Sequence, residues 1–251
     1  MRILIAILPA FLLATVANAQ KTVSFPTEDG GLVSANLYGN ANRAVLLVHG
    51  GRFTKESWAP QIPALVGAGF EVLAIDLRGH GQSHGPGEAD PSDAQLALDV
   101  LAAARYLHSH GAKTVSIVGG SMGGAAAGDA SITSRPGEID RIAMLGAAPN
   151  LSADKLKSPA LFIVARNDTG GDGPRLPGIR AQYEKAPQPK KLVILEGSAH
   201  AQYLFQTDQG SRVMHEMFAV AEFWTAIEVI SIRASQRSRR RRFGKDPAEH
   251  C

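Results

Sequence analysis

Short runs of β-branched and other apolar residues alternate along this chain with longer stretches rich in alanine and leucine. There are eight such runs: TVSF near Thr22, LVSANLY from Leu32, RAVLLVHG from Arg43, FEVLAIDL from Phe70, TVSIVGG from Thr114, RIAMLGA from Arg141, ALFIVAR from Ala160 and KLVILEG from Lys191. Several lack the polar alternation of a half-exposed strand, which indicates strands buried on both faces. The pattern predicts an α/β domain with a mostly parallel sheet of about eight strands flanked by helices. The first two runs, separated by EDGG, predict an antiparallel hairpin.

Two segments between and after these runs have the periodicity of helices. DAQLALDVLAAARYLHSHG places an apolar stripe on one face and ends at Gly111. The stripe consists of Leu96, Leu98, Val100, Leu101, Ala104 and Leu107. A last helix is predicted from about Ser211 to Ile230, with Val213, Met217 and Trp224 among the residues facing the sheet.

The first nineteen residues are typical of a secretory signal. One basic residue, Arg2, precedes an apolar run from Ile3 to Val16, and the small residues Ala17 and Ala19 follow it. As a helix the run would extend about 21 Å, short of the roughly 30 Å of membrane hydrocarbon. We therefore expect cleavage after Ala19 and a secreted or periplasmic protein, with an uncleaved anchor as the alternative.

The positive charge of the chain is concentrated at its end. Residues 233–251 carry seven arginines and lysines and two acidic residues, so this segment contributes +5 and Arg2 another +1 to a total of +3. Residues 20–232, the predicted domain, therefore carry about −3, which gives no ground for expecting a nucleic-acid or membrane-binding surface. Residues 233–251 are predicted to be a solvated, disordered tail, and a tether to anionic polymers is the alternative.

Cysteine usage excludes two ways of stabilising the fold. The single cysteine is Cys251, which leaves no intrachain disulfide and no thiolate cluster for a metal. A chain of 251 residues can bury enough surface to need neither.

The strongest chemical signal is SIVGGSMGGAAAG, in which Gly119, Ser121 and Gly123 satisfy the pattern G-x-S-x-G between a predicted strand and a helix of small residues. A sharp turn from strand to helix requires little side-chain bulk and raises the serine hydroxyl above the sheet edge. We therefore expect Ser121 to be a nucleophile, and a simple glycine-rich turn is the alternative.

A serine nucleophile needs a base, and the base needs a carboxylate to hold its tautomer. Asp168 follows the run ALFIVAR, and His200 follows KLVILEG. Because parallel strands end at one edge of the sheet, Ser121, Asp168 and His200 are expected to meet there. Asp172 is the alternative acid.

The other histidines and two charged residues are predicted to be structural. His49 is expected to pack beside a loop near the nucleophile, His80 and His84 lie in a glycine-rich turn, and His108 and His110 end a helix. Asp76 and Arg78 are expected to fix that turn through a charge-assisted hydrogen bond. An HxH metal site is disfavoured because no carboxylate or cysteine cluster lies nearby in the sequence.

Four segments in this order resemble the α/β-hydrolase superfamily, over residues 22–228. VLLVHGG resembles the strand and oxyanion loop of that family, DLRGHGQS its turn after the next strand, GGSMGG its nucleophile elbow and GSAH its histidine loop. Ala165 departs from the glycine usual in the family. Small hydrolases similar to dienelactone hydrolases and simple carboxylesterases are the nearest in character.

The resemblance implies an α/β-hydrolase fold and two oxyanion donors. The first is the backbone N–H of Met122, and the second is that of Gly51, with Arg52 as the alternative. Only APNLSADKLKSP separates RIAMLGA from ALFIVAR, too little for the helical cap of many relatives. An open site is expected, which the glycine-rich stretch from Thr169 to Pro177 could cover.

These observations predict a secreted serine hydrolase that cleaves carboxylic esters through an acyl-enzyme. Its partner is expected to be a small-molecule ester, and no cofactor, metal or nucleic acid is implied. Thioester, lactone or peptide cleavage would use the same groups, and a non-catalytic binding protein of the same fold is the alternative from another class. The sequence does not predict the oligomeric state.

Overall fold

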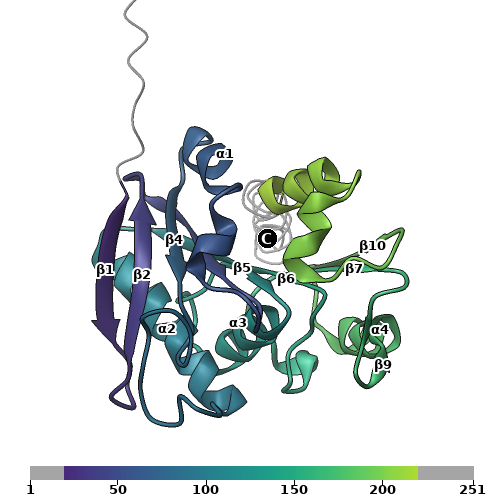
Figure 1. The fold of residues 1–251 in the computed structure, drawn as a ribbon, viewed down its shortest axis with the longest axis horizontal. Helices are drawn as coiled ribbons and strands as arrows, with labels where there is room; N and C mark the ends of the chain where they lie inside the picture. Colours follow the sequence, from purple (N-terminus) through teal and green to yellow (C-terminus); the bar gives the residue numbers. More distant parts are fainter. Residues whose placement is uncertain (1–19, 220–251) are drawn as a thin grey trace, which may run out of the picture.

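A single eight-stranded sheet forms the centre of the protein, seen in a computed structural model that describes residues 20–219 (Figure 1). Its order is β1-β2-β4-β3-β5-β6-β7-β10. The strands are β1 (Lys21–Pro26), β2 (Leu32–Tyr38), β3 (Arg43–Val48), β4 (Glu71–Ile75), β5 (Thr114–Gly120), β6 (Arg141–Leu145), β7 (Ala160–Ala165) and β10 (Lys190–Leu195). All eight correspond to predicted runs. The β1–β2 pair is antiparallel, as expected; β2 also pairs antiparallel with β4, and the strands from β4 to β10 are parallel.

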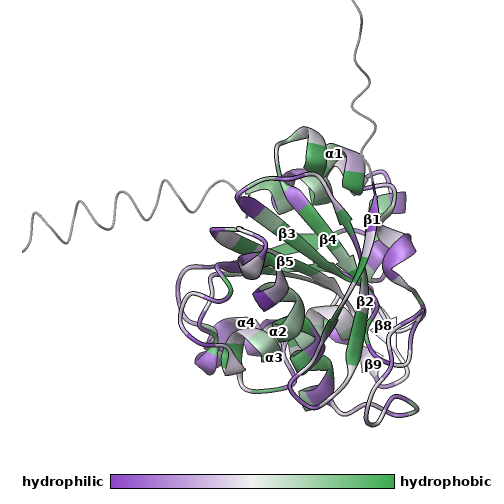
Figure 2. Cartoon of the chain, turned by 90° about the vertical axis from the view of Figure 1, so that its left-hand side faces the viewer, coloured by the Kyte–Doolittle hydropathy of each residue, from purple (hydrophilic) through white to green (hydrophobic). Residues whose placement is uncertain are grey.

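Helices cover both faces of this sheet (Figures 1 and 2). One face carries α2 (Asp93–Ser109), α3 (Met122–Thr133) and α4 (Arg175–Lys185). The other carries α1 (Ile62–Gly67), the 3-10 helices η1 (Lys55–Trp58) and η3 (Ala201–Gln206), and helical residues 210–219. Figure 2 shows the apolar strands between these layers. Every residue of β4, β6 and β7 is buried, which explains why these strands lack polar alternation.

Helix α2 follows the predicted stripe closely. A capping box starts it, in which the Ser92 hydroxyl accepts from the backbone N–H of Gln95. Five residues of the stripe are buried and Leu98 is only half-buried. The buried face also contains a charge, Asp99, which the apolar pattern did not indicate.

Some elements were not assigned from the sequence, among them the segment that follows Asp168. The stretch after Asp168 forms a two-stranded hairpin, β8 (Thr169–Gly170) and β9 (Gly173–Pro174), and leads directly into α4. Separately, the connection from β6 to β7 contains only one short helical segment, the three-residue η2 (Ala153–Lys155). The expectation that this connection carries no helical cap is therefore confirmed.

Several predictions concern segments outside residues 20–219. These are the signal at 1–19, the basic tail at 233–251 and the far end of the last helix, which was predicted to reach Ile230. Of the predicted helix, residues 211–219 are helical. None of the helices within the described range has the length and apolar character needed to cross a membrane.

Asp76 and Arg78 fix the turn after β4, but through partners other than each other. Asp76 accepts from Lys55 Nζ at 2.5 Å and from the backbone N–H of Gln82. The guanidinium of Arg78, 1% exposed, donates to both Asp99 and Asp29. The hydrogen bond from Arg78 lowers the pKa of Asp29 far below its usual range. The turn is thus tied to α2 and to the loop after β1.

Replacing Arg78 should destabilise the protein strongly. Arg78→Ala would leave the carboxylate of Asp99, 1% exposed, buried without its cation, which typically lowers the free energy of unfolding by about 3–5 kcal/mol. Urea denaturation followed by circular dichroism measures this. Arg166→Ala, which removes an exposed pair with Glu196, is the control and should have little effect. Equal losses in the two variants would contradict the argument.

Candidate active site

Ser121 lies on a sharp turn between β5 and α3. Its backbone has φ 50° and ψ −119°, a left-handed conformation that a non-glycine residue adopts only when its surroundings impose it. The flanking glycines allow the close packing behind this turn: a Cβ at Gly119 would lie 2.3 Å from the carbonyl oxygen of Gly123, and one at Gly123 would lie 2.4 Å from that of His49. The predicted strand-to-helix turn is therefore present, with Ser121 at its apex.

Ser121, His200 and Asp168 form one hydrogen-bonded chain. His200 Nε2 is 2.8 Å from Ser121 Oγ, and His200 Nδ1 is 2.8 Å from Asp168 Oδ2. A carboxylate only accepts, so Nδ1 carries the proton and Nε2 is left to accept from the serine hydroxyl. The structure thus brings together the three residues predicted to meet, from the ends of β5, β7 and β10. Asp172, the alternative acid, is exposed in the turn between β8 and β9.

Asp168 is buried with its second oxygen facing a cation. The residue has 0% exposure, and its Oδ1 lies 3.4 Å from Arg175 Nε. The Arg175 backbone N–H also donates to the carbonyl of Asp168 at 2.9 Å. The hairpin β8–β9 spans the residues between them, so the start of α4 is held against the acid.

Gly146, directly after β6, provides the space in which His200 and Asp168 meet. A Cβ there would lie 2.8 Å from His200 Nδ1 and 3.0 Å from Asp168 Oδ2, and Gly146 has φ +63°. Its backbone N–H is anchored by Ile163 O at 2.7 Å, so the backbone cannot easily retreat. Only glycine fits both the conformation and the contact.

The loop after β3 presents backbone N–H groups beside Ser121. The N–H of Gly50 is taken, because it donates to Gln202 Oε1 at 3.1 Å. Among residues 20–219, the N–H groups of Gly51, Arg52 and Met122 have no acceptor, and all three residues line a cavity that includes Ser121 and His200. Gly51 and Met122, the predicted donors, therefore both have an open N–H and line the cavity at Ser121, and so does Arg52, the alternative to Gly51.

His49 and His80 support this loop and are not part of the hydrogen-bonded chain of Ser121, His200 and Asp168. His49 is fully buried and its Nε2 accepts from the backbone N–H of Leu77. Burial lowers the pKa of His49 to about 4, so its ring stays neutral and able to accept near neutral pH. His80 Nε2 is 3.0 Å from the carbonyl of Gly51. Both bear out a structural role.

His84, His108 and His110 also have structural contacts. The His84 backbone pairs with Leu32 as an isolated bridge. His108 bonds the carbonyls of Ala112 and Glu138 at the end of α2, and His110 contacts Tyr106. Within residues 20–219, no three His, Cys, Asp or Glu side chains are grouped as metal ligands would be.

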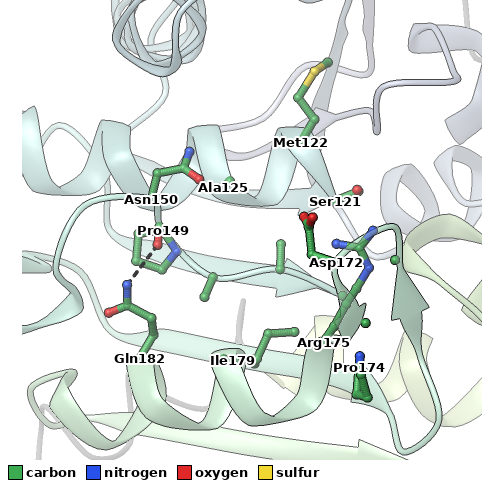
Figure 3. Close-up of a pocket in the computed structure, with 16 residues that line it drawn as sticks. Ser121, Met122, Ala125, Pro149, Asn150, Asp172, Pro174, Arg175, Ile179 and Gln182 are labelled. Carbon is green, nitrogen blue, oxygen red and sulfur yellow. Dashed lines mark hydrogen bonds between the residues drawn. The ribbon is translucent and has the colours of Figure 1, made fainter.

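Two cavities meet at Ser121. The first, about 590 Å³, is lined by Ala125, Ala147, Pro149 and Ile179, and by the polar residues Asp172, Arg175 and Gln182 (Figure 3). The second, about 500 Å³, contains His200 together with Gly51, Arg52, Phe53, Arg175 and Tyr203. Ser121, Met122, Gly170 and Arg175 line both. A molecule bound across Ser121 would therefore extend into two different environments.

A family model for the α/β-hydrolase fold matches residues 43–204, well over half of the chain. The chain belongs to the α/β-hydrolase fold family. Esterases and a dienelactone hydrolase are among its structural neighbours, as the sequence motifs suggested.

Individual α/β hydrolases are similar over different parts of the chain. Mouse (Mus musculus) protein phosphatase methylesterase 1 is 28% identical over 132 residues, 52% of this chain and 34% of that protein. The chain thus spans about a third of that relative. An esterase of Pyrococcus furiosus has 21% identity and a TM-score of 0.63, covering 79% of this chain and 91% of its own. A dienelactone hydrolase of Anabaena variabilis has 24% identity and a TM-score of 0.63, covering 83% and 96%.

Three residues of the site were not identified from the sequence. Gly146 appears in RIAMLGA, where a glycine ending a buried strand was a usable signal. Gln202, in GSAHAQ, is buried and bridges Gly50 N and Ser57 Oγ. Arg175 lies in an unassigned helix, and no local pattern distinguishes it from a surface arginine.

A methyl group at Gly146 should impair the site without preventing folding. Gly146→Ala would push His200 or Asp168 out of line, and a displacement of about 1 Å can lower activity about 100-fold. Hydrolysis of 4-nitrophenyl acetate measures the loss. Gly137→Ala is the matched control, because Gly137 has a similar φ of +83° with open space around it. It should lose stability but keep its activity, and a similar loss of activity in both variants would refute the steric argument.

Proposed function

We propose that this protein is a serine hydrolase that cleaves carboxylic esters through an acyl-enzyme intermediate. The observation that carries the proposal is the hydrogen-bonded chain from Ser121 Oγ through His200 to Asp168, with both distances 2.8 Å. Membership of the α/β-hydrolase fold family supports hydrolysis as the general type of reaction. The esterases among the similar proteins support a carboxylic ester as the substrate.

In the first half of the reaction, Ser121 Oγ attacks the ester carbonyl carbon while His200 Nε2 takes the hydroxyl proton. Asp168 keeps the imidazole oriented and stabilises its positive charge. The carbonyl oxygen becomes an oxyanion, which the N–H groups of Met122 and Gly51 would stabilise. Losing one such donor typically costs about 3–4 kcal/mol of transition-state stabilisation.

Collapse of this intermediate breaks the bond to the leaving alcohol, and His200 returns the proton to the leaving oxygen. Water then attacks the acyl-enzyme with His200 again as base, which releases the acid and restores Ser121. The two cavities fit these two parts of a substrate. Because His200 lines only the second of them, the alcohol part occupies that cavity and the acyl part the first, beside Ala125 and Ile179.

Labelling and turnover test this proposal directly. A fluorophosphonate probe should label the protein at Ser121, as located by peptide mass spectrometry, and should not label Ser121→Ala. Aryl-ester turnover should fall by at least about 10³-fold in Ser121→Ala and in Asp168→Asn, because the former lacks the nucleophile and the latter favours the wrong tautomer. Asp172→Asn is the matched control and should retain activity. Absence of both labelling and turnover in the unmodified protein would reject the proposal.

We also propose that the hydrolase is exported and acts outside the cytoplasm. Support comes from residues 1–19, with their single basic residue, apolar run and small residues before Gln20. Expression of the full chain in a bacterium that exports proteins should give a mature form beginning at Gln20, read by N-terminal sequencing. Retention of Met1 in cytoplasmic protein would contradict export.

A further inference from the structure

The cavity assigned to the alcohol part of the substrate is lined by two arginines and no acidic residue. Arg52 and Arg175 both line it, together with Phe53 and Tyr203. The acyl-side cavity shares Arg175 but also contains Asp172. The two sides of Ser121 therefore differ in charge, and only the alcohol side is purely cationic.

The guanidinium of Arg175 is held in place but not neutralised on all sides. Its Nε faces Asp168 Oδ1 at 3.4 Å, while the terminal nitrogens donate to no acceptor within residues 20–219. The guanidinium lies close to Gly170, where a Cβ would be 2.5 Å from Nη2. Figure 3 shows it between α4 and Ser121. The hairpin thus fixes a half-exposed cation beside the nucleophile.

Helix stability does not explain this arginine. Arg175 is the first residue of α4, whose first turn contains no acidic side chain. A cation at this end of a helix is unfavourable because the exposed N–H groups already carry partial positive charge. A carboxylate contacting the terminal nitrogens would satisfy donors that the protein leaves open.

An aromatic pair completes the wall of this cavity. Phe53 and Tyr203 lie with ring centroids 5.3 Å apart at 59°, and Tyr203 is 45% exposed, one of two exposed large apolar residues in the described part of the chain. Such a pair offers apolar faces to a planar group, and no aspartate or glutamate lines the space to repel an anion.

From these contacts we propose that the preferred substrates are esters whose alcohol part is an aromatic ring carrying a carboxylate. The ring lies against Phe53 and Tyr203, and the carboxylate is bound by Arg175 with Arg52 contributing charge. This rests on the proposed serine hydrolase activity and specifies the substrate class of the same site. The acyl part is neutral, since Asp172 disfavours an anion on its side.

The test compares two esters that differ only in charge on the alcohol part. 4-Acetoxybenzoate and 4-acetoxybenzamide have the same acyl group and nearly the same shape, and dividing each kcat/KM by the hydroxide-catalysed rate removes the difference in leaving-group reactivity. The wild-type protein should prefer the carboxylate by about tenfold or more, equivalent to about 1.4 kcal/mol. Added salt should reduce this preference.

Variants assign the preference to individual residues. The carboxylate-to-amide ratio should fall about tenfold in Arg175→Gln, fall less in Arg52→Gln, and recover partly in Arg175→Lys. Arg180→Gln is the matched control, because Arg180 is exposed on α4 and lines neither cavity; its ratio should not change. If Arg175→Gln does not fold, the role of the arginines in the carboxylate preference is still tested by Arg52→Gln, by Arg175→Lys and by the salt dependence.

Several results would overturn the inference. One is a wild-type ratio near one. Another is a ratio that Arg180→Gln lowers as much as Arg175→Gln, which would indicate only general charge attraction. A third concerns a carboxylate on the acyl part: the 4-nitrophenyl monoester of terephthalic acid is compared with 4-nitrophenyl benzoate. If this preference exceeds the carboxylate-to-amide ratio of the two acetoxy esters, the anion binds on the acyl side. An active, probe-labelled enzyme with these results would contradict the substrate class alone, whereas no labelling and no turnover would contradict the proposed activity as well.

Discussion

His200 can hydrogen-bond to Ser121 and Asp168 at once because the carboxyl ends of four adjacent parallel strands lie side by side. The residue between the side chains, Gly146, has no side chain of its own to separate them. Strands β5, β6, β7 and β10 are neighbours and parallel, so the residues that follow them emerge side by side. Strand β6 contributes none of the three side chains, but Gly146, the residue directly after it, is where the imidazole and the carboxylate pack. The spacing of the site is therefore set by backbone as much as by the reacting groups.

Buried charge organises the rim around this edge. Asp76 pairs with Lys55, and Arg78 joins α2 to the loop after β1, so the turn after β4 is fastened from two directions. Single buried ions are costly, and these are paired and hydrogen-bonded on nearly every side. Arg175 differs because its partner, Asp168, leaves the outer nitrogens uncovered. The contrast separates charges that hold the fold from a charge that faces the cavities at Ser121.

Much of the fold was predictable because its signals are local or depend on order. Buried parallel strands produce continuous apolar runs such as ALFIVAR, and G-x-S-x-G at a strand end indicates a turn with a defined shape. The placement of Asp168 and His200 required only that parallel strands end together. By contrast, α4 has a weak apolar face in which only Ile179 is buried, so periodicity did not indicate it. The partners of Arg78 depend on Asp29 and Asp99, which are distant in sequence and lack a distinguishing pattern.

Gln202 joins two halves of the site that are otherwise separate in the chain. Its amide oxygen accepts from Gly50 and its amide nitrogen donates to Ser57, and it lies two residues after His200 in a segment where Ala201 has φ 50°. Any shift of the histidine segment must therefore pull on the loop that presents Gly51. The His200 segment and the loop after β3 thus depend on one shared amide side chain for their relative placement.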